Sequence, residues 1–297
     1  MRTKNMLALA TLATLSLAAC SNEEDVQLTD MQDMPITYTA GINELSSRAG
    51  TALKEGSFGL YLTTDGTTDP KYTANNLKVT YEGSAWKPAS QLLWKGNNTT
   101  VTYHAYMPYQ STVTGTADAP QLAVKINTIQ TDETMKADDF CYAAEQTATA
   151  ATNRGSINLA FDHKLAKLTV LLTASSELSE GITFNLVSLA NSITSATCNL
   201  NNGKLTADTE TQSVALNNSN NYTFEGILIP QTFNKNLTIN IAASNNKTYQ
   251  FVSPENLVFN PGKSYQLTLT VGRDKVTMGT ITAQPWESVT GGDLVTD

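Results

Sequence analysis

The chain has 297 residues and a formal net charge of −8, and only 15% of its residues are charged. An acidic chain of this kind is not attracted by charge to nucleic acid or to an anionic membrane, so both are excluded as electrostatic partners. Threonine and asparagine are abundant, which favours strands and turns and is typical of an extracellular β-protein. The length is sufficient for two domains of ordinary size.

The N-terminus has the pattern of a secretory signal. Arg2 and Lys4 precede an apolar run from residue 6 to residue 19, which is shorter than a membrane span of about 20 residues. The run ends in Leu-Ala-Ala-Cys at residues 17–20, which resembles a bacterial lipobox. We therefore predict a signal peptide over 1–19, cleavage between Ala19 and Cys20, and lipidation of Cys20. The alternative is a plain signal peptide with an incidental cysteine.

Three acidic residues, Glu23, Glu24 and Asp25, follow the predicted anchor. Repulsion between like charges is expected to keep this stretch as a solvated spacer. The stretch also resembles the export signal that directs lipoproteins to the outer face of the outer membrane in some anaerobic Gram-negative bacteria. The expected location is therefore the outer membrane, with the protein exposed at the cell surface.

Alternation of apolar and polar residues predicts the strands, because successive side chains of a strand point to opposite faces. The clearest alternating ranges are 34–42, 58–62, 77–81, 101–107, 157–161, 182–186, 237–241 and 265–271. Asn202-Gly203 predicts a two-residue hairpin turn. Since no window of useful length shows a helical stripe, the expected fold is all-β, built as antiparallel β-sandwiches.

The connection between two domains is expected in the Ala- and Thr-rich stretch from residue 145 to residue 155. We place the boundary near residue 156, within about ten residues, between an N-terminal domain of 49–156 and a C-terminal domain of 157–297. Just beyond it, the apolar positions change from odd to even numbers near Ala166 and Lys167. A strand whose buried face changes in this way must bulge or bend.

Residue patterns typical of catalysis or metal binding are missing from the sequence. The two histidines, His104 and His163, lie in strand-like runs, where a lone histidine is expected to be packed or hydrogen-bonded. No further ligands stand at the spacing of a zinc site. We expect no enzymatic activity, no metal and no cofactor. Cys141 and Cys198 are expected to be buried free thiols, although an oxidising compartment would permit a disulfide.

Five segments resemble strands of the fimbrillin family, the lipoprotein pilins of anaerobic Gram-negative bacteria. They are Phe-Gly-Leu-Tyr at 58–61, Tyr-His-Ala-Tyr-Met-Pro at 103–108, Phe-Asp-His-Lys-Leu-Ala-Lys-Leu at 161–168, Ile-Pro-Gln-Thr at 229–232 and Pro-Gly-Lys-Ser-Tyr at 261–265. Because they occur in order behind a lipobox, the chain is identified as a member of this family. The resemblance implies a fold of two tandem transthyretin-like antiparallel β-sandwiches with Greek-key connections.

The resemblance also implies assembly by strand exchange. In the family, the first strand completes the N-terminal sandwich until an arginine-specific protease cuts just beyond it, and a C-terminal extension of the next subunit then fills the groove. The cut is expected here between Arg48 and Ala49, which would remove the leader 20–48; the alternative is an ordinary loop arginine. The releasable strand is expected in 34–42, with one face formed by Ile36, Tyr38, Ala40 and Ile42.

The donor segment is expected at the C-terminus, where Pro285 could act as a hinge because proline has no amide to donate. In a resting monomer we expect this segment to pack as the final strand of its own domain. Its candidate side chains are Val276, Met278, Ile281, Trp286, Val289 and Leu294.

The expected function is that of a fimbrial structural subunit or adhesin. The expected partners are other fimbrillin subunits, the processing protease and a host or bacterial surface ligand, and the final location is the fimbrium. One alternative is a fimbrillin-like surface lipoprotein that does not polymerise. Another is a glycan-binding surface lipoprotein, which would need an exposed aromatic platform from Trp86, Trp94 or Trp286.

Overall fold

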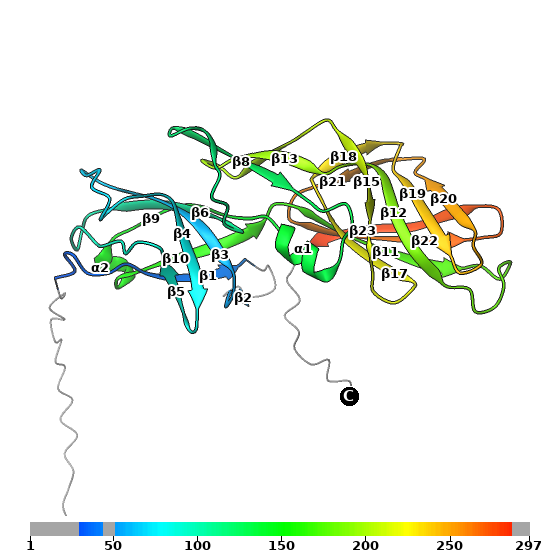
Figure 1. Cartoon of the computed structure of the whole chain (residues 1–297), viewed down its shortest axis with the longest axis horizontal. Coiled ribbons are helices and arrows are strands. Elements are labelled where there is room, and N and C mark those ends of the chain that lie inside the picture. The colour runs from blue at the N-terminus through cyan, green and yellow to red at the C-terminus, as the bar shows by residue number, and fades with distance from the viewer. Residues whose placement is uncertain (1–29, 44–50, 287–297) are drawn as a thin grey trace, which may run out of the picture.

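The computed structural model describes residues 30–43 and 51–286, and these residues form mostly β-strands (Figure 1). Two short helices interrupt them, α1 (Asp132–Asp138) and α2 (Ala150–Asn153). Within the described ranges, no helix has the length and apolar character needed to cross a membrane. The prediction of an all-β fold is confirmed.

The strands of the N-terminal half form one curved sheet. Its members are β1 (Thr37–Ile42), β2 (Thr51–Ala52), β3 (Ser57–Thr64), β4 (Ala74–Glu82), β5 (Ala85–Pro88), β6 (Val101–Met107), β9 (Cys141–Ala148) and β10 (Ser156–His163). Their order is β2-β1-β10-β9-β6-β3-β4-β5, and β1 contacts β5, so the sheet bends around one hydrophobic cluster. This N-terminal core includes the buried side chains of Phe58, Leu60, Trp94, Tyr103, Ile157 and Phe161.

The C-terminal half contains two larger sheets and a two-stranded ribbon. The first sheet has the strands β16 (Asn217–Asn218), β17 (Thr223–Leu228), β11 (Ala166–Ala174), β22 (Lys263–Val271) and β23 (Val276–Pro285), in that order. The second has β15 (Thr211–Ala215), β12 (Phe184–Ile193), β19 (Thr238–Ala243) and β20 (Thr248–Val252), and the ribbon pairs β18 (Gln231–Asn234) with β21 (Asn256–Phe259). The two sheets enclose the C-terminal core, which includes Leu168, Val170, Phe184, Leu189, Ile239 and Leu267.

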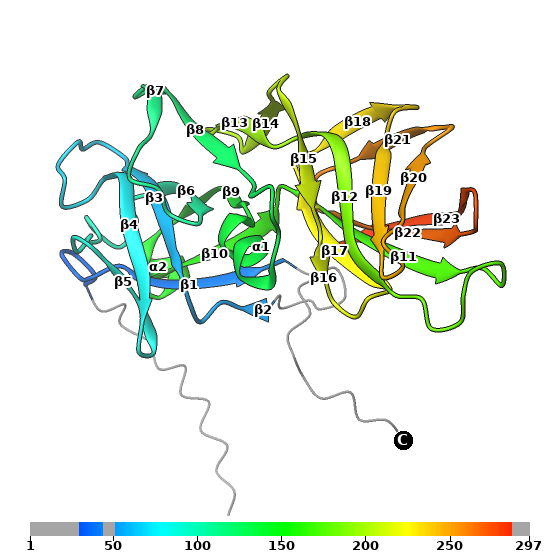
Figure 2. The same ribbon diagram turned by 45° about the vertical axis from the view of Figure 1, so that its right-hand side comes forward.

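A further sheet contains strands from both halves of the chain. It consists of β14 (Lys204–Ala207), β13 (Ser195–Asn199), β8 (Ala119–Lys125) and β7 (Thr114–Thr116), and β8 pairs antiparallel with β13. Figure 2 shows these strands along the upper side of the molecule, between the two halves. Beneath them lies a third cluster, the joining cluster, which includes Tyr106, Leu122, Phe140, Tyr142, Cys198 and Ile227.

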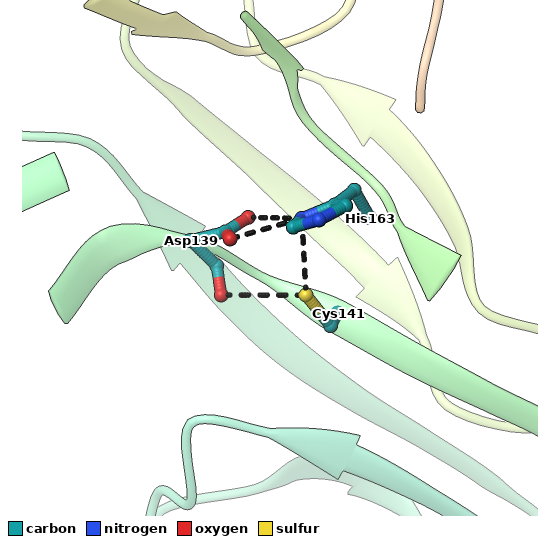
Figure 3. Close-up of side chains that lie close together, drawn as sticks. All are labelled: Asp139, Cys141 and His163. Carbon is teal, nitrogen blue, oxygen red and sulfur yellow. Dashed lines mark hydrogen bonds and ion pairs between the residues drawn. The ribbon is translucent and has the colours of Figure 1, made fainter. Parts of the chain in front are cut away.

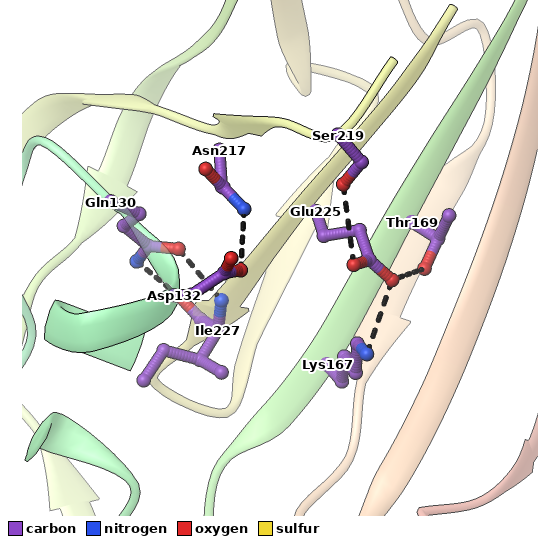
Figure 4. A network of polar contacts seen from close by, with 8 residues as sticks. All are labelled: Gln130, Asp132, Lys167, Thr169, Asn217, Ser219, Glu225 and Ile227. Atoms are coloured by element: carbon purple, nitrogen blue, oxygen red, sulfur yellow. Dashed lines mark hydrogen bonds and ion pairs between the residues drawn. The ribbon is translucent and has the colours of Figure 1, made fainter. Parts of the chain in front are cut away.

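Gln130 adds a polar contact between the halves (Figure 4). Its side-chain amide donates to the carbonyl oxygen of Ile227 and its side-chain oxygen accepts from the amide of Ile227, each at 2.8 Å. Nearby, the carboxylate of Asp132 accepts from the side-chain amide of Asn217 at 2.7 Å. Because Gln130 satisfies both backbone groups of one residue of β17, it fixes the position of the loop before α1 against the C-terminal half.

The change of buried face predicted near Ala166 is confirmed. β10 ends at His163 in the N-terminal sheet and β11 begins at Ala166 in the C-terminal sheet. The expected boundary near residue 156 falls at the first residue of β10, so sheet membership changes slightly later, at Lys164 and Leu165.

Three details differ from the sequence expectation. The prediction of a two-residue turn at Asn202-Gly203 is wrong, because the loop between β13 and β14 spans residues 200–203. Two strand pairs, β1 with β10 and β11 with β22, are parallel, since alternation reveals a buried face but not a strand direction. Helix α1 was not predicted, because none of its residues is buried and it therefore has no apolar stripe. It begins at a capping box formed by Thr131 and Thr134.

Substitution of Gly203 by alanine is expected to destabilise the protein by about 2–4 kcal/mol. Gly203 has a φ of +66°, and an added Cβ would overlap the ring of Tyr142 in the joining cluster. Gly83 is a matched control, because its φ is +69° but an added Cβ would meet nothing within 4 Å. Urea unfolding of both variants separates the backbone strain from the overlap, and equal losses of stability would contradict the packing role of Gly203.

Candidate functional site

The first strand is an inserted element of the N-terminal sheet. β1 lies between β10 and the short β2, and pairs in parallel with β10 from Thr37 opposite Ser156 to Ile42 opposite Phe161. The face that alternation predicted is buried in the N-terminal core, with exposed fractions of 2% for Ile36, 7% for Tyr38, 7% for Ala40 and 5% for Ile42. Three apolar side chains of β1, together with Ile36 directly before it, therefore occupy one part of this core.

Polar contacts also hold β1 along β10, but most of them are exposed. The hydroxyl of Thr39 donates to the side-chain oxygen of Asn158, and the side-chain amide of Asn43 donates to Asp162, both at 2.9 Å. The amide of Asn43 donates to the carbonyl of Phe161 at 2.8 Å. Exposed hydrogen bonds of this kind exchange readily with water, so the buried face provides most of the attachment.

Tyr38 carries a defect within this buried face. Its hydroxyl is buried and has no hydrogen-bond partner among the described residues. Burial raises the pKa of Tyr38 well above its usual value, so the hydroxyl stays neutral. An unpaired buried hydroxyl costs about 1–3 kcal/mol, which weakens the attachment of β1 by that amount.

The segment that joins β1 to the rest of the chain is short. β1 ends at Ile42 and β2 begins at Thr51. The predicted cleavage residues Arg48 and Ala49 lie between these strands and outside the described residues, as do Ala19 and Cys20. Their predicted roles therefore remain predictions.

The C-terminal strand packs on its own half, as expected for a resting monomer. β23 is the edge strand of the five-stranded sheet and pairs antiparallel with β22. Val276, Met278 and Ile281 are partly buried against the C-terminal core, and a register shift separates Met278 from Ile281. Val289 and Leu294 lie outside the described residues.

Trp286 connects the end of β23 with the end of β10. Its backbone amide donates to the carbonyl of Gly262 at 3.0 Å. Its indole stacks on the imidazole of His163, with ring centroids 4.1 Å apart and an interplanar angle of 4°. Since β10 also pairs with β1, one strand contacts both the first strand and the C-terminal segment.

His163 lies in a small buried cluster with Asp139 and Cys141 (Figure 3). Nδ1 of His163 is 3.0 Å and 2.9 Å from the two carboxylate oxygens of Asp139, and 3.4 Å from Sγ of Cys141. Burial, together with the nearby carboxylate of Asp139, raises the pKa of the Cys141 thiol well above its usual value. The prediction of a packed, hydrogen-bonded His163 is confirmed.

This cluster does not have the geometry of a catalytic relay. In such a relay the nucleophile and the orienting carboxylate bind different ring nitrogens of the histidine. Here the thiol and the carboxylate both approach Nδ1 of His163. The thiol of Cys141 is also protonated, because its pKa is raised.

Cys141 and Cys198 are both buried and free, in agreement with the expectation of free thiols.

His104 lies on the face of the N-terminal sheet that points away from the N-terminal core. Its imidazole stacks on Tyr61 with ring centroids 4.9 Å apart, at the wall of an open cavity of about 440 Å³. Burial lowers the pKa of His104 below its usual value, while the nearby Glu145 acts in the opposite direction. His104 is thus a packed neutral side chain at neutral pH.

The tryptophans do not form an exposed platform in the part of the chain that the structure describes. Trp86 and Trp94 are buried in the N-terminal core, with exposed fractions of 7% and 0%. Trp86 packs against Phe58, with ring centroids 4.9 Å apart. The aromatic surface that a glycan-binding protein would need is therefore not provided by these two residues.

Comparisons with known proteins agree with this architecture. A family described as fimbrillin-like matches residues 47–286. A candidate cell adhesion protein of Bacteroides uniformis has 21% identity and a TM-score of 0.66, over 85% of this chain and 98% of that one. A candidate cell adhesion protein of Bacteroides ovatus has 20% identity and a TM-score of 0.68, over 86% and 99%.

A fimbrial protein of Bacteroides vulgatus is similar at 16% identity and a TM-score of 0.54, over 85% of this chain and 99% of that chain. At identities this low the solved structures show a shared fold. No curated protein sequence matches the chain.

Replacement of Tyr38 by phenylalanine is expected to stabilise the protein by about 1–2 kcal/mol, because it removes the unpaired buried hydroxyl and keeps the ring. Tyr103→Phe is the matched control, since the hydroxyl of Tyr103 reaches Gln146 and the carbonyl of Asn158, each at 3.3 Å. That variant is expected to lose about 0.5–1.5 kcal/mol. The measurement is urea unfolding, and a destabilised Tyr38→Phe variant would contradict the defect described above.

Truncation of Trp286 is expected to loosen the end of β23 locally. In Trp286→Ala the amides of residues 281–284 should exchange with solvent about tenfold faster, because the stacking contact with His163 is lost. Trp286→Phe should retain most of the protection, and the amides near Val276 serve as an internal reference. Unchanged exchange at residues 281–284 would show that Trp286 does not anchor the strand.

Proposed function

The chain belongs to the fimbrillin-like family, and from that premise we propose that it is a fimbrial subunit, exported as a surface lipoprotein and assembled by strand exchange after cleavage at Arg48. In this proposal β1 is the strand that leaves, and the C-terminal segment of the next subunit takes its place. The protein acts through binding and assembly and has no catalytic role.

The observation that carries the proposal is the position of β1. It is buried on one face, exposed along most of its polar contacts, and connected to β2 by a segment that contains Arg48. A cut after Arg48 would leave β1 attached by non-covalent contacts alone. Its departure would free the hydrogen-bonding edge of β10 and the part of the N-terminal core beneath it, which is the kind of groove that accepts an added strand.

The energies favour exchange over simple loss of the strand. Burial of an Ile side chain is worth about 1.5–3 kcal/mol, and two are buried here, Ile42 of β1 and Ile36 directly before it. A bare groove is therefore costly, and a cut strand stays in place until another strand competes for it. The unpaired hydroxyl of Tyr38 shifts the exchange equilibrium toward the donor, because a donor with an apolar side chain at that position avoids the penalty.

The C-terminal segment has the properties of such a donor. Val276, Met278 and Ile281 are apolar and only partly buried in their own half. Among the described strands β23 pairs with β22 alone, so its detachment would uncover one sheet edge and the part of the C-terminal core that these side chains cover. Trp286, Val289 and Leu294 would extend the apolar face of the donor.

One observation favours a second candidate function. β1 fills the groove and β23 packs on its own sheet, so the uncut chain is complete by itself. A fimbrillin-like lipoprotein that is never cut would remain a monomer on the cell surface. Cleavage at Arg48 is thus the step that separates the two functions.

The test is the N-terminus of the protein recovered from the cell surface. The natural sequence is expected to begin at Ala49, and Arg48→Ala is expected to keep Cys20 at its N-terminus and to form no filaments. Arg154→Ala is the matched control, because Arg154 is an exposed arginine that caps helix α2 at a φ of 51° and lies far from the predicted cut in the sequence. It should be processed normally. Filaments formed by uncut Arg48→Ala protein would refute the proposal.

A further inference from the structure

The cluster of Asp139, Cys141 and His163 brings three different potential metal-ligand atoms close together. A carboxylate oxygen of Asp139, Sγ of Cys141 and Nδ1 of His163 all lie within 4.8 Å of one another. They converge from the turn before β9, from β9 and from β10 (Figure 3). We propose that these three residues bind a divalent transition-metal ion of the zinc class.

The distances suit such an ion. A tetrahedral zinc site with bonds of about 2.0–2.3 Å has ligand atoms about 3.3–3.8 Å apart. The separation of Sγ and Nδ1 is 3.4 Å, which already lies in this range. The carboxylate oxygens are 2.9 Å and 3.0 Å from Nδ1, so the Asp139 side chain must move by a few tenths of an ångström.

The chemistry of the donors also suits this ion. Thiolate, imidazole and carboxylate together form a donor set typical of zinc and unlike the all-oxygen sets of calcium and magnesium. The thiol and the carboxylate both lie close to Nδ1 of His163, so an ion placed between the three atoms could contact all of them.

Rigid elements hold the three side chains. Cys141 and His163 are direct cross-strand partners in the antiparallel pair of β9 and β10. The amide of Lys164 donates to the carbonyl of Phe140 at 2.9 Å, which fixes the backbone beside both residues. The indole of Trp286 covers one face of the imidazole. A site built on paired strands keeps its geometry, so little ordering is needed when an ion binds.

One side of the cluster reaches solvent. The side chains of His163 and Asp139 are 5% and 22% exposed. The carboxylate edge is the route for an ion and the position where water would complete a tetrahedral site. On binding, the Sγ–H bond of Cys141 breaks, the sulfur binds the metal, and the proton goes to the buffer. Affinity should therefore rise with pH.

The direct test is a titration with Co²⁺ under reducing conditions. The mature chain from residue 20 is used with Cys20→Ser, which leaves Cys141 and Cys198 as the only thiols. One equivalent of Co²⁺ is expected to give a sulfur-to-cobalt charge-transfer band in the near ultraviolet, together with visible bands of tetrahedral Co²⁺. An equivalent of Zn²⁺ should abolish both. Absence of the charge-transfer band would overturn the proposal.

Two cysteine variants locate the site. Cys141→Ser is expected to remove the charge-transfer band, whereas Cys198→Ser should keep it, because Cys198 is equally buried but lies in the joining cluster. Asp139→Asn should weaken Zn²⁺ binding by about tenfold or more. Retention of the band in Cys141→Ser would overturn the assignment, and far-ultraviolet circular dichroism confirms that each variant is folded.

A second readout does not depend on the sulfur. Co²⁺ at the site would quench the fluorescence of Trp286, since its indole stacks on the ligand His163. The quenching should disappear in Trp286→Phe, while the charge-transfer band persists. Equal quenching in the two proteins would place the bound ion away from His163 and contradict the proposal.

Discussion

β10 is the strand on which the arrangement of the molecule depends. It pairs in parallel with β1 on one side and antiparallel with β9 on the other. Ile157, Leu159 and Phe161 place its apolar face in the N-terminal core, and His163 at its end contacts Trp286. Three residues later, at Ala166, the chain enters the C-terminal sheet. The first strand, the C-terminal segment and the connection between the halves therefore share one structural support.

Local patterns in the sequence predicted several strands and most of their buried faces, but missed β8 and placed Leu186 on a buried face although it is exposed. Ile36, Tyr38, Ala40 and Ile42 alternate with polar residues, and all four are buried. The change of buried face after His163 was equally visible, because parity is a property of neighbouring residues. Strand direction and sheet partners depend on contacts between distant segments. For this reason the alternation of apolar and polar residues could not predict the parallel pairing of β1 or the pairing of β8 with β13.

The candidate site likewise has a part that the sequence predicted and a part that it did not. The first strand could be predicted from its alternation, together with the family resemblance. The cluster of Asp139, Cys141 and His163 could not, because its members come from different strands and the usual metal-binding spacings are local. The missing partner of the Tyr38 hydroxyl is likewise a property of the assembled core. Asp139 two residues before Cys141, followed later by a histidine in a strand, was the available signal in the sequence, and many unrelated chains would share it.

The sheet shared by the two halves has a mechanical consequence. A subunit held at its N-terminal groove by one neighbour and at its C-terminal segment by another would carry tension across the contact between its halves. The pairing of β8 with β13 and the two hydrogen bonds of Gln130 cross this contact. Under load the halves cannot swing apart as beads on a linker would. A filament built from such subunits would stretch by rupture of whole strand ladders, so its stiffness would be set by backbone pairing within each subunit as well as by the joints between subunits.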